Sequence, residues 1–305
     1  GVERVPQVVP TRRHGGPGVH QRRRHVVVPA GVLAVPVRQQ DDVGRCGGLP
    51  RPAGQLPGVV KLIFSSAFGM DAAFDPQNPT QVKIGRRLAI KVLNAAKFVL
   101  SFPVPEGAEV THALDAAMLA TLDQVVRDAT KAFDSYDHAR ALEVTEAFFW
   151  TFCDDYLELV KERAYNQTDA GQASAALALR LALSTLLRLL APVLAFATEE
   201  AWSWFEDGSI HTAAWPEPLE IAGDPAVLAA ASAALIGIRR AKTEAKASQK
   251  TPVARLVLRA DDATIAALRS AEGDLKAVGR IAELELIGGG DALAVDAVEL
   301  ATEEV

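Results

Sequence analysis

Apolar residues recur every three or four positions between residues 81 and 250, which is the spacing that places them on one face of an α-helix. In residues 81–100 this face consists of Ile84, Leu88, Val92, Ala95 and Val99. The same spacing predicts four further helical segments, at residues 112–133, 138–163, 172–205 and 225–249. Four or five long helices joined by short polar segments predict a helical bundle over residues 61–250.

The expected inward faces of two of these helices are rich in large side chains. In residues 112–133 the face consists of Leu114, Met118, Leu122, Val125, Val126 and Ala129. In residues 138–163 it consists of Phe149, Phe152, Cys153, Tyr156 and Val160. These two helices should therefore supply much of the core.

The segment 172–205 is the most apolar part of the chain, and Pro192 lies within it. Because proline lacks a backbone N–H and clashes with the preceding turn, the helix must kink or restart there. Thr198 followed by Glu199 and Glu200 is typical of a helix N-terminus, where a hydroxyl caps and carboxylates complement the dipole. We therefore expect a second helix to start at Thr198.

After Lys250 the hydrophobic pattern changes from a helical period to an alternating one. VARLVLRA, IAELELIGG and ALAVDAVELA alternate as strands do, and residues 261–280 have a helical pattern. We predict a small α/β domain over residues 251–305, with one helix packed on a three-stranded sheet. The predicted fold class is therefore mainly α, with a bundle followed by this domain.

Residues 1–60 show neither the helical period nor the alternation typical of strands, and they differ in composition from the rest of the chain. They contain nine arginines, ten glycines, eight prolines and no lysine, Phe, Trp or Tyr. Such a segment has little apolar surface to bury and is expected to be irregular. It could be a basic arm for RNA; we favour the interpretation that it is the translation of a GC-rich gene out of frame.

Composition excludes several classes of protein. The chain has 305 residues, 49% of them hydrophobic, and a net charge of −6, so any nucleic-acid contact must come from local basic patches. No apolar run is long enough for a membrane span, and no secretion signal precedes the bundle. Cys46 and Cys153 form neither a disulfide framework nor a metal-ligand spacing, which is typical of the cytoplasm.

A second face of the helix at residues 81–100 is cationic. We call Lys83, Arg87, Lys91, Asn94 and Lys97 the basic stripe, and Phe98 lies at its edge. Such a face suits RNA, because the cations can meet phosphates and the ring can stack on an unpaired base. The alternative is an ordinary solvated helix face with Phe98 turned into the core. Two further candidate RNA contacts lie in the last predicted helix of the bundle, at Arg239 and Arg240.

The stretch GRRLAIKVLNAAKFVL resembles the first helix of the anticodon-binding bundle in class I aminoacyl-tRNA synthetases for branched aliphatic amino acids. The positions that match are Lys91, Asn94, Ala95, Lys97 and Phe98. Three later stretches, FWTFCDDYLELVK, LAPVLAFATEEAW and SIHTAAWP, resemble later elements of the same family in the same order. The resemblance covers about residues 67–250, and the sequence is most similar to the valyl-tRNA synthetases within this family.

Two positions depart from the family pattern. Ala195 stands where a second proline is usual, and Asp155 stands where an aromatic residue is common. The H-x-G-H and K-M-S-K-S sequences of the family's ATP site do not occur in the printed sequence. The resemblance therefore implies a chain that binds tRNA but is catalytically inactive alone.

The resemblance also implies the partners. The full family enzyme uses ATP and Mg²⁺ to join valine to its tRNA, whereas this chain should hold no cofactor. Its expected partners are a valine-accepting tRNA and the missing catalytic domain, and it should be a cytoplasmic monomer without membrane contact. Two alternatives remain open: a fragment of an isoleucyl- or leucyl-tRNA synthetase, and a non-enzymatic helical interaction scaffold.

A search for independent chemistry returns little. The six histidines show no metal-ligand spacing. The neighbouring carboxylates Asp154 and Asp155, and likewise Glu199 and Glu200, point to different helix faces and are poor acid–base pairs. No catalytic or metal-binding residue is predicted.

Overall fold

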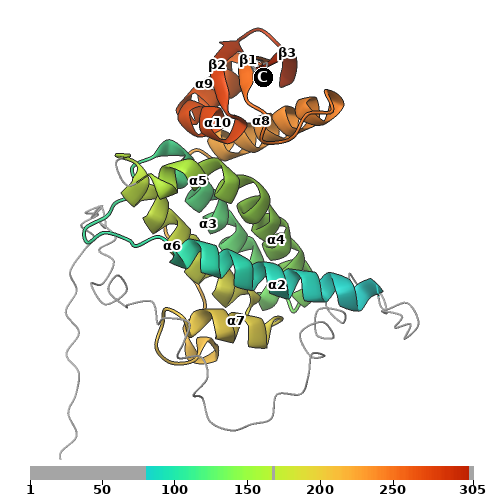
Figure 1. The fold of residues 1–305 in the computed structure, drawn as a ribbon. Coiled ribbons are helices and arrows are strands. Elements are labelled where there is room, and N and C mark those ends of the chain that lie inside the picture. The colour runs from blue at the N-terminus through green and yellow to red at the C-terminus, as the bar shows by residue number, and fades with distance from the viewer. Residues whose placement is uncertain (1–79, 167–168, 302–305) are drawn as a thin grey trace, which may run out of the picture.

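The computed structural model describes residues 80–166 and 169–301, with side chains from Gly85 onward. The segment 1–60, for which we expected an irregular conformation, lies outside these residues. Within the described residues the bundle contains seven α-helices: α2 (Thr80–Leu100), α3 (Ala113–Asp134), α4 (His138–Thr151), α5 (Leu157–Tyr165), α6 (Gln172–Leu190), α7 (Ala195–Trp202) and α8 (Pro225–Glu244). The predicted fold class, mainly α with a small α/β domain at the C-terminal end, is confirmed (Figure 1).

The predicted apolar faces form the core of the bundle. In α2, Leu88, Val92, Ala95 and Val99 are each at most 4% exposed. The inward residues of α3 are likewise buried, except Val125, which is partly exposed at the edge of the core. Because α2 lies across one side of the bundle and packs on α6 and α7, its opposite face is left for solvent (Figure 1).

The third predicted helix contains a π-helical turn. Helix α4 continues through η3 (Phe152–Tyr156), a π-helix, into α5 without a break in the chain direction. A π turn adds one residue to a helical turn and shifts the buried face around the axis. Burial accordingly moves from Phe148 and Phe149 before the turn to Leu157 and Leu159 after it.

Cys153 lies within this turn and is 3% exposed. Burial raises the pKa of its thiol to about 12, although the charge of Lys91 opposes the shift. A thiol in such surroundings stays protonated and unreactive near neutral pH. Cys153 is therefore a core residue.

The helix after Pro192 starts earlier than predicted. α7 begins at Ala195, and Thr198 is fully buried, with its hydroxyl donating to the carbonyl oxygen of Leu194 at 3.1 Å. The N-cap prediction for Thr198 is wrong, because its hydroxyl bonds back to the preceding turn instead. Glu199 instead accepts hydrogen bonds from Ser209 and from the amide of Ile210, which fixes η4 (Ile210–Thr212) beside α7.

The segment between α7 and α8 crosses α3 as an extended strap, residues 213–224. Trp215 Nε1 donates to Thr130 Oγ1 at 2.8 Å, and the buried carboxylate of Asp123 accepts from the amides of Leu219 and Glu220. A buried carboxylate satisfied by two amides holds an irregular segment firmly to a helix. The strap then meets α3 at Gly223, which lies against the backbone of Ala116.

Strands β1 (Val253–Arg259), β2 (Ile281–Ile287) and β3 (Ala294–Leu300) form a sheet in the order β2-β1-β3. β1 pairs with β2 in parallel and with β3 antiparallel. The connection from β1 to β2 contains two helices, α9 (Asp262–Ser270) and α10 (Glu272–Gly279), where we had predicted one. We refer to these five elements as the C-terminal domain.

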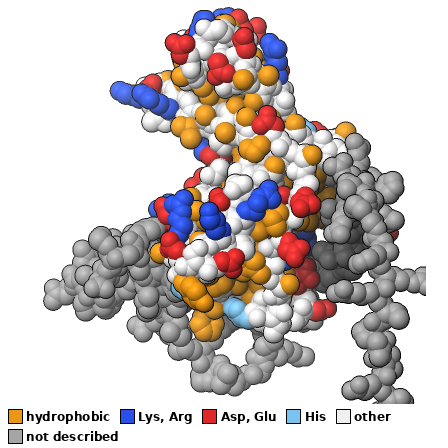
Figure 2. Space-filling model, turned by 180° about the vertical axis from the view of Figure 1, so that it is seen from behind, with side chains coloured by type: hydrophobic (Ala, Val, Ile, Leu, Met, Phe, Trp, Pro, Cys, Tyr) orange, Lys and Arg blue, Asp and Glu red, His pale blue; other side chains and the backbone are white. Residues whose placement is uncertain are grey.

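The C-terminal domain sits at one end of the bundle, and Figure 2 shows a waist between the two parts. On the face seen there, basic and acidic side chains lie interspersed over the bundle. α8 ends at Glu244, earlier than the predicted residue 249. Lys242, in its last turn, is 1% exposed and donates to the carbonyls of Gln249 and Gly279, which ties α8 to α10.

One helix in the described part, α6, is long and apolar enough to cross a membrane by length and composition alone. In the structure, 72% of its apolar window is buried inside the protein. α6 is therefore the central helix of the bundle, which accounts for its composition.

Candidate nucleic-acid interface

The basic stripe lies on the outer face of α2. Arg87, Asn94 and Lys97 are exposed, and Lys91 is partly buried. The side chain of Lys83 lies outside the described part of the chain. The helical period therefore places the described stripe residues on one accessible face, as predicted.

Two cations of the stripe are held by Trp150, a partly buried residue near the end of α4. The guanidinium carbon of Arg87 lies 5.5 Å from the centre of the indole ring, and Lys91 Nζ lies 5.9 Å from it. Lys91 also forms an ion pair with Asp154 at 2.8 Å. Cation–π contacts of this kind restrict the two side chains at little cost in desolvation.

A second tryptophan holds the far end of the stripe. Lys97 Nζ lies 5.7 Å from the ring centre of Trp204, just after α7. The stripe thus contacts two indole rings from other parts of the bundle, one on α4 and one just after α7. Cations positioned in this way lose less side-chain entropy when they meet a phosphate.

Phe98 is partly buried and belongs to a cluster of three rings. Its ring centre lies 5.0 Å from that of Phe102 and 6.1 Å from that of Tyr165, both in edge-to-face geometry. Phe102 is buried, whereas Tyr165 is 58% exposed. The cluster therefore joins the core to the surface at the C-terminal end of α2.

The two candidates on α8 lie in different surroundings. Arg239 donates to the carbonyl oxygen of Asp154 at 2.8 Å and lies 3.5 Å from the carboxylate of Asp155. Since Lys91 contacts the side chain of the same Asp154, Arg239 is close to the stripe. Arg240 instead forms an exposed pair with Glu244 on its own helix. The structure therefore groups Arg239, and not Arg240, with α2.

Sequence reasoning missed Trp150, Trp204 and Tyr165. The two tryptophans lie in the aromatic runs FFW and WSWF, and Tyr165 is the last residue of α5. Partly buried indole rings beside a lysine-rich face are a signal for cation–π pairing. The sequence alone does not show which helix they meet.

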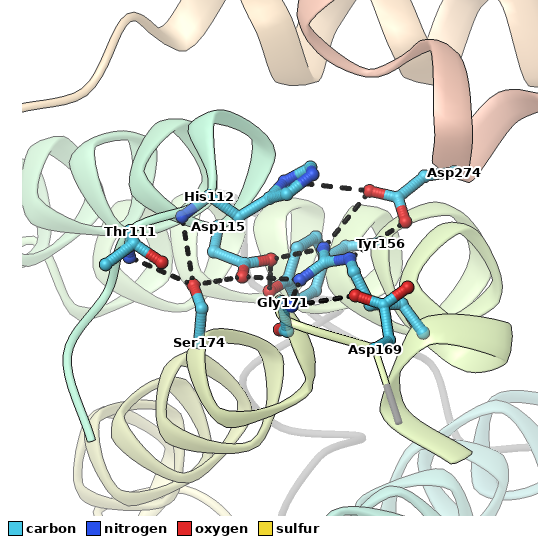
Figure 3. A network of polar contacts seen from close by, with 9 residues as sticks. Thr111, His112, Asp115, Tyr156, Asp169, Gly171, Ser174 and Asp274 are labelled. Atoms are coloured by element: carbon cyan, nitrogen blue, oxygen red, sulfur yellow. Dashed lines mark hydrogen bonds and ion pairs between the residues drawn. The ribbon is translucent and has the colours of Figure 1, made fainter. Parts of the chain in front are cut away.

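A buried polar network joins the bundle to the C-terminal domain (Figure 3). Arg163, on α5, is 6% exposed and forms two hydrogen bonds with each of two buried carboxylates, Asp115 on α3 and Asp274 on α10. Tyr156 and Ser174 both donate to Asp115, at 2.8 and 2.6 Å. The network therefore links three helices of the bundle, and the π turn, to α10.

Charge pairing keeps Arg163 protonated. Burial alone would lower the pKa of Arg163, but the hydrogen bonds and charges of Asp115 and Asp274 hold it above its ordinary value. Burial and the charge of Asp115 raise the pKa of Tyr156, so its hydroxyl remains a donor. A buried network in which charged groups share several hydrogen bonds favours one packing arrangement.

Residues 115–258 match the family model of the anticodon-binding domain of tRNA ligase. The match extends from α3 through the strap and α8 to Leu258 in β1, and α2 lies before it, so this part of the bundle is similar to the anticodon-binding domain of the tRNA ligases. The fold class and the family resemblance inferred from the sequence are confirmed.

Within this class the chain is similar to the valine–tRNA ligases. It is 59% identical over 241 residues to the valine–tRNA ligase of Leifsonia xyli, covering 77% of this chain and 28% of that protein. The valine–tRNA ligase of Thermobifida fusca is 52% identical over 250 residues, and that of Cutibacterium acnes is 48% identical over 237 residues. The matches cover 79% and 75% of this chain but only 28% and 27% of those proteins. The chain thus spans little more than a quarter of the length of these relatives.

Proposed function

We propose that this chain binds the anticodon arm of a valine-accepting tRNA through the outer face of α2, as part of a valine–tRNA ligase. The observation that carries the proposal is the arrangement of Arg87, Lys91 and Lys97 on two tryptophan rings, on the helix that precedes the residues matching the anticodon-binding family. Accessible cations with adjacent aromatic rings are the usual means of binding a single-stranded loop of RNA.

The similarity to valine–tRNA ligases over more than two thirds of the chain supports valine over isoleucine or leucine. The interaction-scaffold alternative would leave the basic stripe without effect on RNA binding. Measurements of RNA binding by variants of the stripe therefore test the scaffold alternative.

We assign to this chain tRNA binding and not the activation of valine. The ATP-site sequences expected for the family are absent from the 305 residues, and no group of three metal-binding side chains occurs among residues 80–166 and 169–301. The residues present do not fit an ATP–Mg²⁺ site, so we derive no catalytic step here. Valine-dependent pyrophosphate exchange by this chain alone would contradict the assignment.

Replacing Arg87 with glutamine should weaken binding to every tRNA by a similar factor, because a phosphate contact carries no sequence information. The dependence of log K on log salt should flatten by about 0.7–0.9 for each phosphate group that the variant no longer neutralises. Filter binding of valine tRNA, and of the same tRNA with a changed anticodon, measures both effects from low to moderate salt.

The matched control is Arg240→Gln, which removes an exposed guanidinium that is paired with Glu244 away from α2. It should leave the salt dependence unchanged. If Arg87→Gln and the control give the same binding curve as the parent chain, α2 is not the tRNA surface.

Replacing Phe98 with alanine separates base stacking from core packing. As a partly exposed ring beside the stripe, Phe98 should contribute about 1–3 kcal/mol to binding of valine tRNA by stacking. The matched control is Phe102→Ala, which removes a ring that is 4% exposed in the same cluster. Phe102→Ala should cost about 3–5 kcal/mol in stability.

Filter binding measures the affinity of each variant for valine tRNA, and a thermal melt measures its stability. If Phe98→Ala lowers stability as much as Phe102→Ala does and leaves the affinity of the folded protein unchanged, Phe98 is a core residue only.

A further inference from the structure

Two arginines on α6, Arg180 and Arg188, are partly buried and lack an ion pair in the described part of the chain. The Nε atom of Arg180 is buried without a hydrogen-bond partner, and its guanidinium carbon lies 5.4 Å from the ring centre of Phe205. Arg188 donates only to the carbonyl oxygens of Ser184 and Ala214, at 3.2 and 3.4 Å. Two partly desolvated cations therefore lie on one helix, with no carboxylate of the described residues within 4 Å.

Arg180 lies near the end of the basic stripe, and Arg188 lies two turns further along the same helix. Lys97 lies over the ring of Trp204, and Arg180 lies over the ring of the next residue, Phe205. α7 packs against both α2 and α6, so consecutive rings just after α7 each hold a cation from a different helix. Trp204 and the buried Phe205 therefore bring Lys97 of α2 and Arg180 of α6 to neighbouring positions.

Among the described residues, Glu206 is the carboxylate whose charge acts on both guanidinium groups. Burial raises the pKa of Glu206, although the charges of Arg180 and Arg188 oppose that shift. Burial also lowers the pKa of each arginine, and the charge of Glu206 only partly offsets this. Asp207 also acts on Glu206, and neither carboxylate forms an ion pair with Arg180 or Arg188 among the described residues. Both guanidinium groups therefore lack a direct anionic partner there, in surroundings where charge is poorly screened.

We propose that Arg180 and Arg188, together with Lys97, form a phosphate-binding extension of the α2 surface that holds the backbone of the bound RNA. The ligand class is the phosphodiester group, for which guanidinium groups have matching donor geometry. This inference rests on the proposed function, because it assigns the path of the same RNA beyond α2. A purely structural alternative is that Arg180 supports α7 by packing on Phe205.

The test uses the full chain and a hairpin RNA with the sequence of the valine tRNA anticodon arm. Arg180→Gln and Arg188→Gln should each weaken binding about fivefold at low salt and flatten the salt dependence by about 0.7–0.9. The loss should be equal for a hairpin with a changed anticodon, because phosphates are the same in both. The control is Arg269→Gln, an exposed arginine on α9 in the C-terminal domain.

Glu206→Gln should change the affinity for the hairpin in the opposite direction. If Arg180, Arg188 and Lys97 bind phosphate, removing the competing carboxylate should tighten hairpin binding about twofold to fivefold. If Glu206 and the arginines serve only the fold, the same change should lower the melting temperature and leave the affinity unchanged. That outcome would overturn the inference.

Arg180→Lys keeps the charge and covers the case in which Arg180→Gln does not fold. Its salt dependence should equal that of the parent chain. If Arg87→Gln weakens binding while the changes at Arg180, Arg188 and Glu206 have no effect, the extension is wrong and the function proposed for α2 stands. If Arg87→Gln also has no effect, the proposed function itself fails.

Discussion

Replacing Arg163 with methionine should lower the free energy of unfolding by about 3–5 kcal/mol, because the change leaves buried carboxylates without their cation. Arg163 lies between Asp115 and Asp274, which are 0% and 4% exposed. Without the guanidinium group, the folded state must either hold two like charges near each other or admit water. Urea unfolding followed by tryptophan fluorescence measures the loss.

Arg255→Met is the matched control. Arg255 pairs with Glu285 and Glu299 on the exposed face of the sheet, where an ion pair contributes at most about 1 kcal/mol. Asp274→Asn should give an intermediate loss, since Arg163 keeps its pair with Asp115. A loss below about 1 kcal/mol for Arg163→Met would show that the network is hydrated and does not fix the C-terminal domain to the bundle.

Replacing Gly223 with alanine should cost about 3 kcal/mol, at the upper end of the range for overpacking. A Cβ atom at this position would overlap the carbonyl group of Ala116 and lie 2.8 Å from the amide nitrogen of Ala117. These are backbone atoms of α3 and cannot move without distorting the helix. The strap would have to lift, which would strain the hydrogen bonds that Asp123 accepts from it.

The control for this change is Gly273→Ala in α10, where an added Cβ atom meets nothing within 4 Å. Alanine there should stabilise the protein by about 0.4–1 kcal/mol, because it restricts the unfolded chain. The two substitutions add the same methyl group and should shift the urea midpoint in opposite directions. Equal shifts would mean that the strap does not pack on α3 as described.

Helical periodicity predicted the core of the bundle because burial of one face follows directly from the spacing of apolar residues. Leu88, Val92 and Leu122 are buried where the pattern placed them, and Pro192 interrupts the helix as its missing N–H requires. The start of α7 was misplaced because a Thr-Glu-Glu run is equally compatible with a position one turn into a helix. The buried hydroxyl of Thr198 shows which position the fold selects.

The candidate interface was predicted only in part. The spacing of Arg87, Lys91, Asn94 and Lys97 placed them on one face of α2, a local property of a helix. Their partners are not local, since Trp150 and Trp204 lie far along the chain and meet α2 only after the bundle packs. Arg239 and Arg240 are adjacent in sequence. The packing of α8 places Arg239 beside Asp154 and leaves Arg240 exposed.

The buried network was not predicted because its charged residues resemble surface positions. Arg163 ends a helix with alternating charges, and Asp274 lies in the first turn of α10, where a carboxylate normally faces solvent. Their burial depends on the docking of the C-terminal domain against α5, a contact between segments more than 100 residues apart in sequence.

The π turn at Phe152–Tyr156 has a consequence for the lengths of chain that this domain tolerates. Deletion of one residue there would let α4 and α5 run as one regular α-helix and would rotate everything after it by about 100°. Arg163 would then point away from Asp115, and Asp154 would leave Lys91. The extra residue thus sets the rotation about the helix axis between the half of the helix beside the basic stripe and the half that contacts the C-terminal domain.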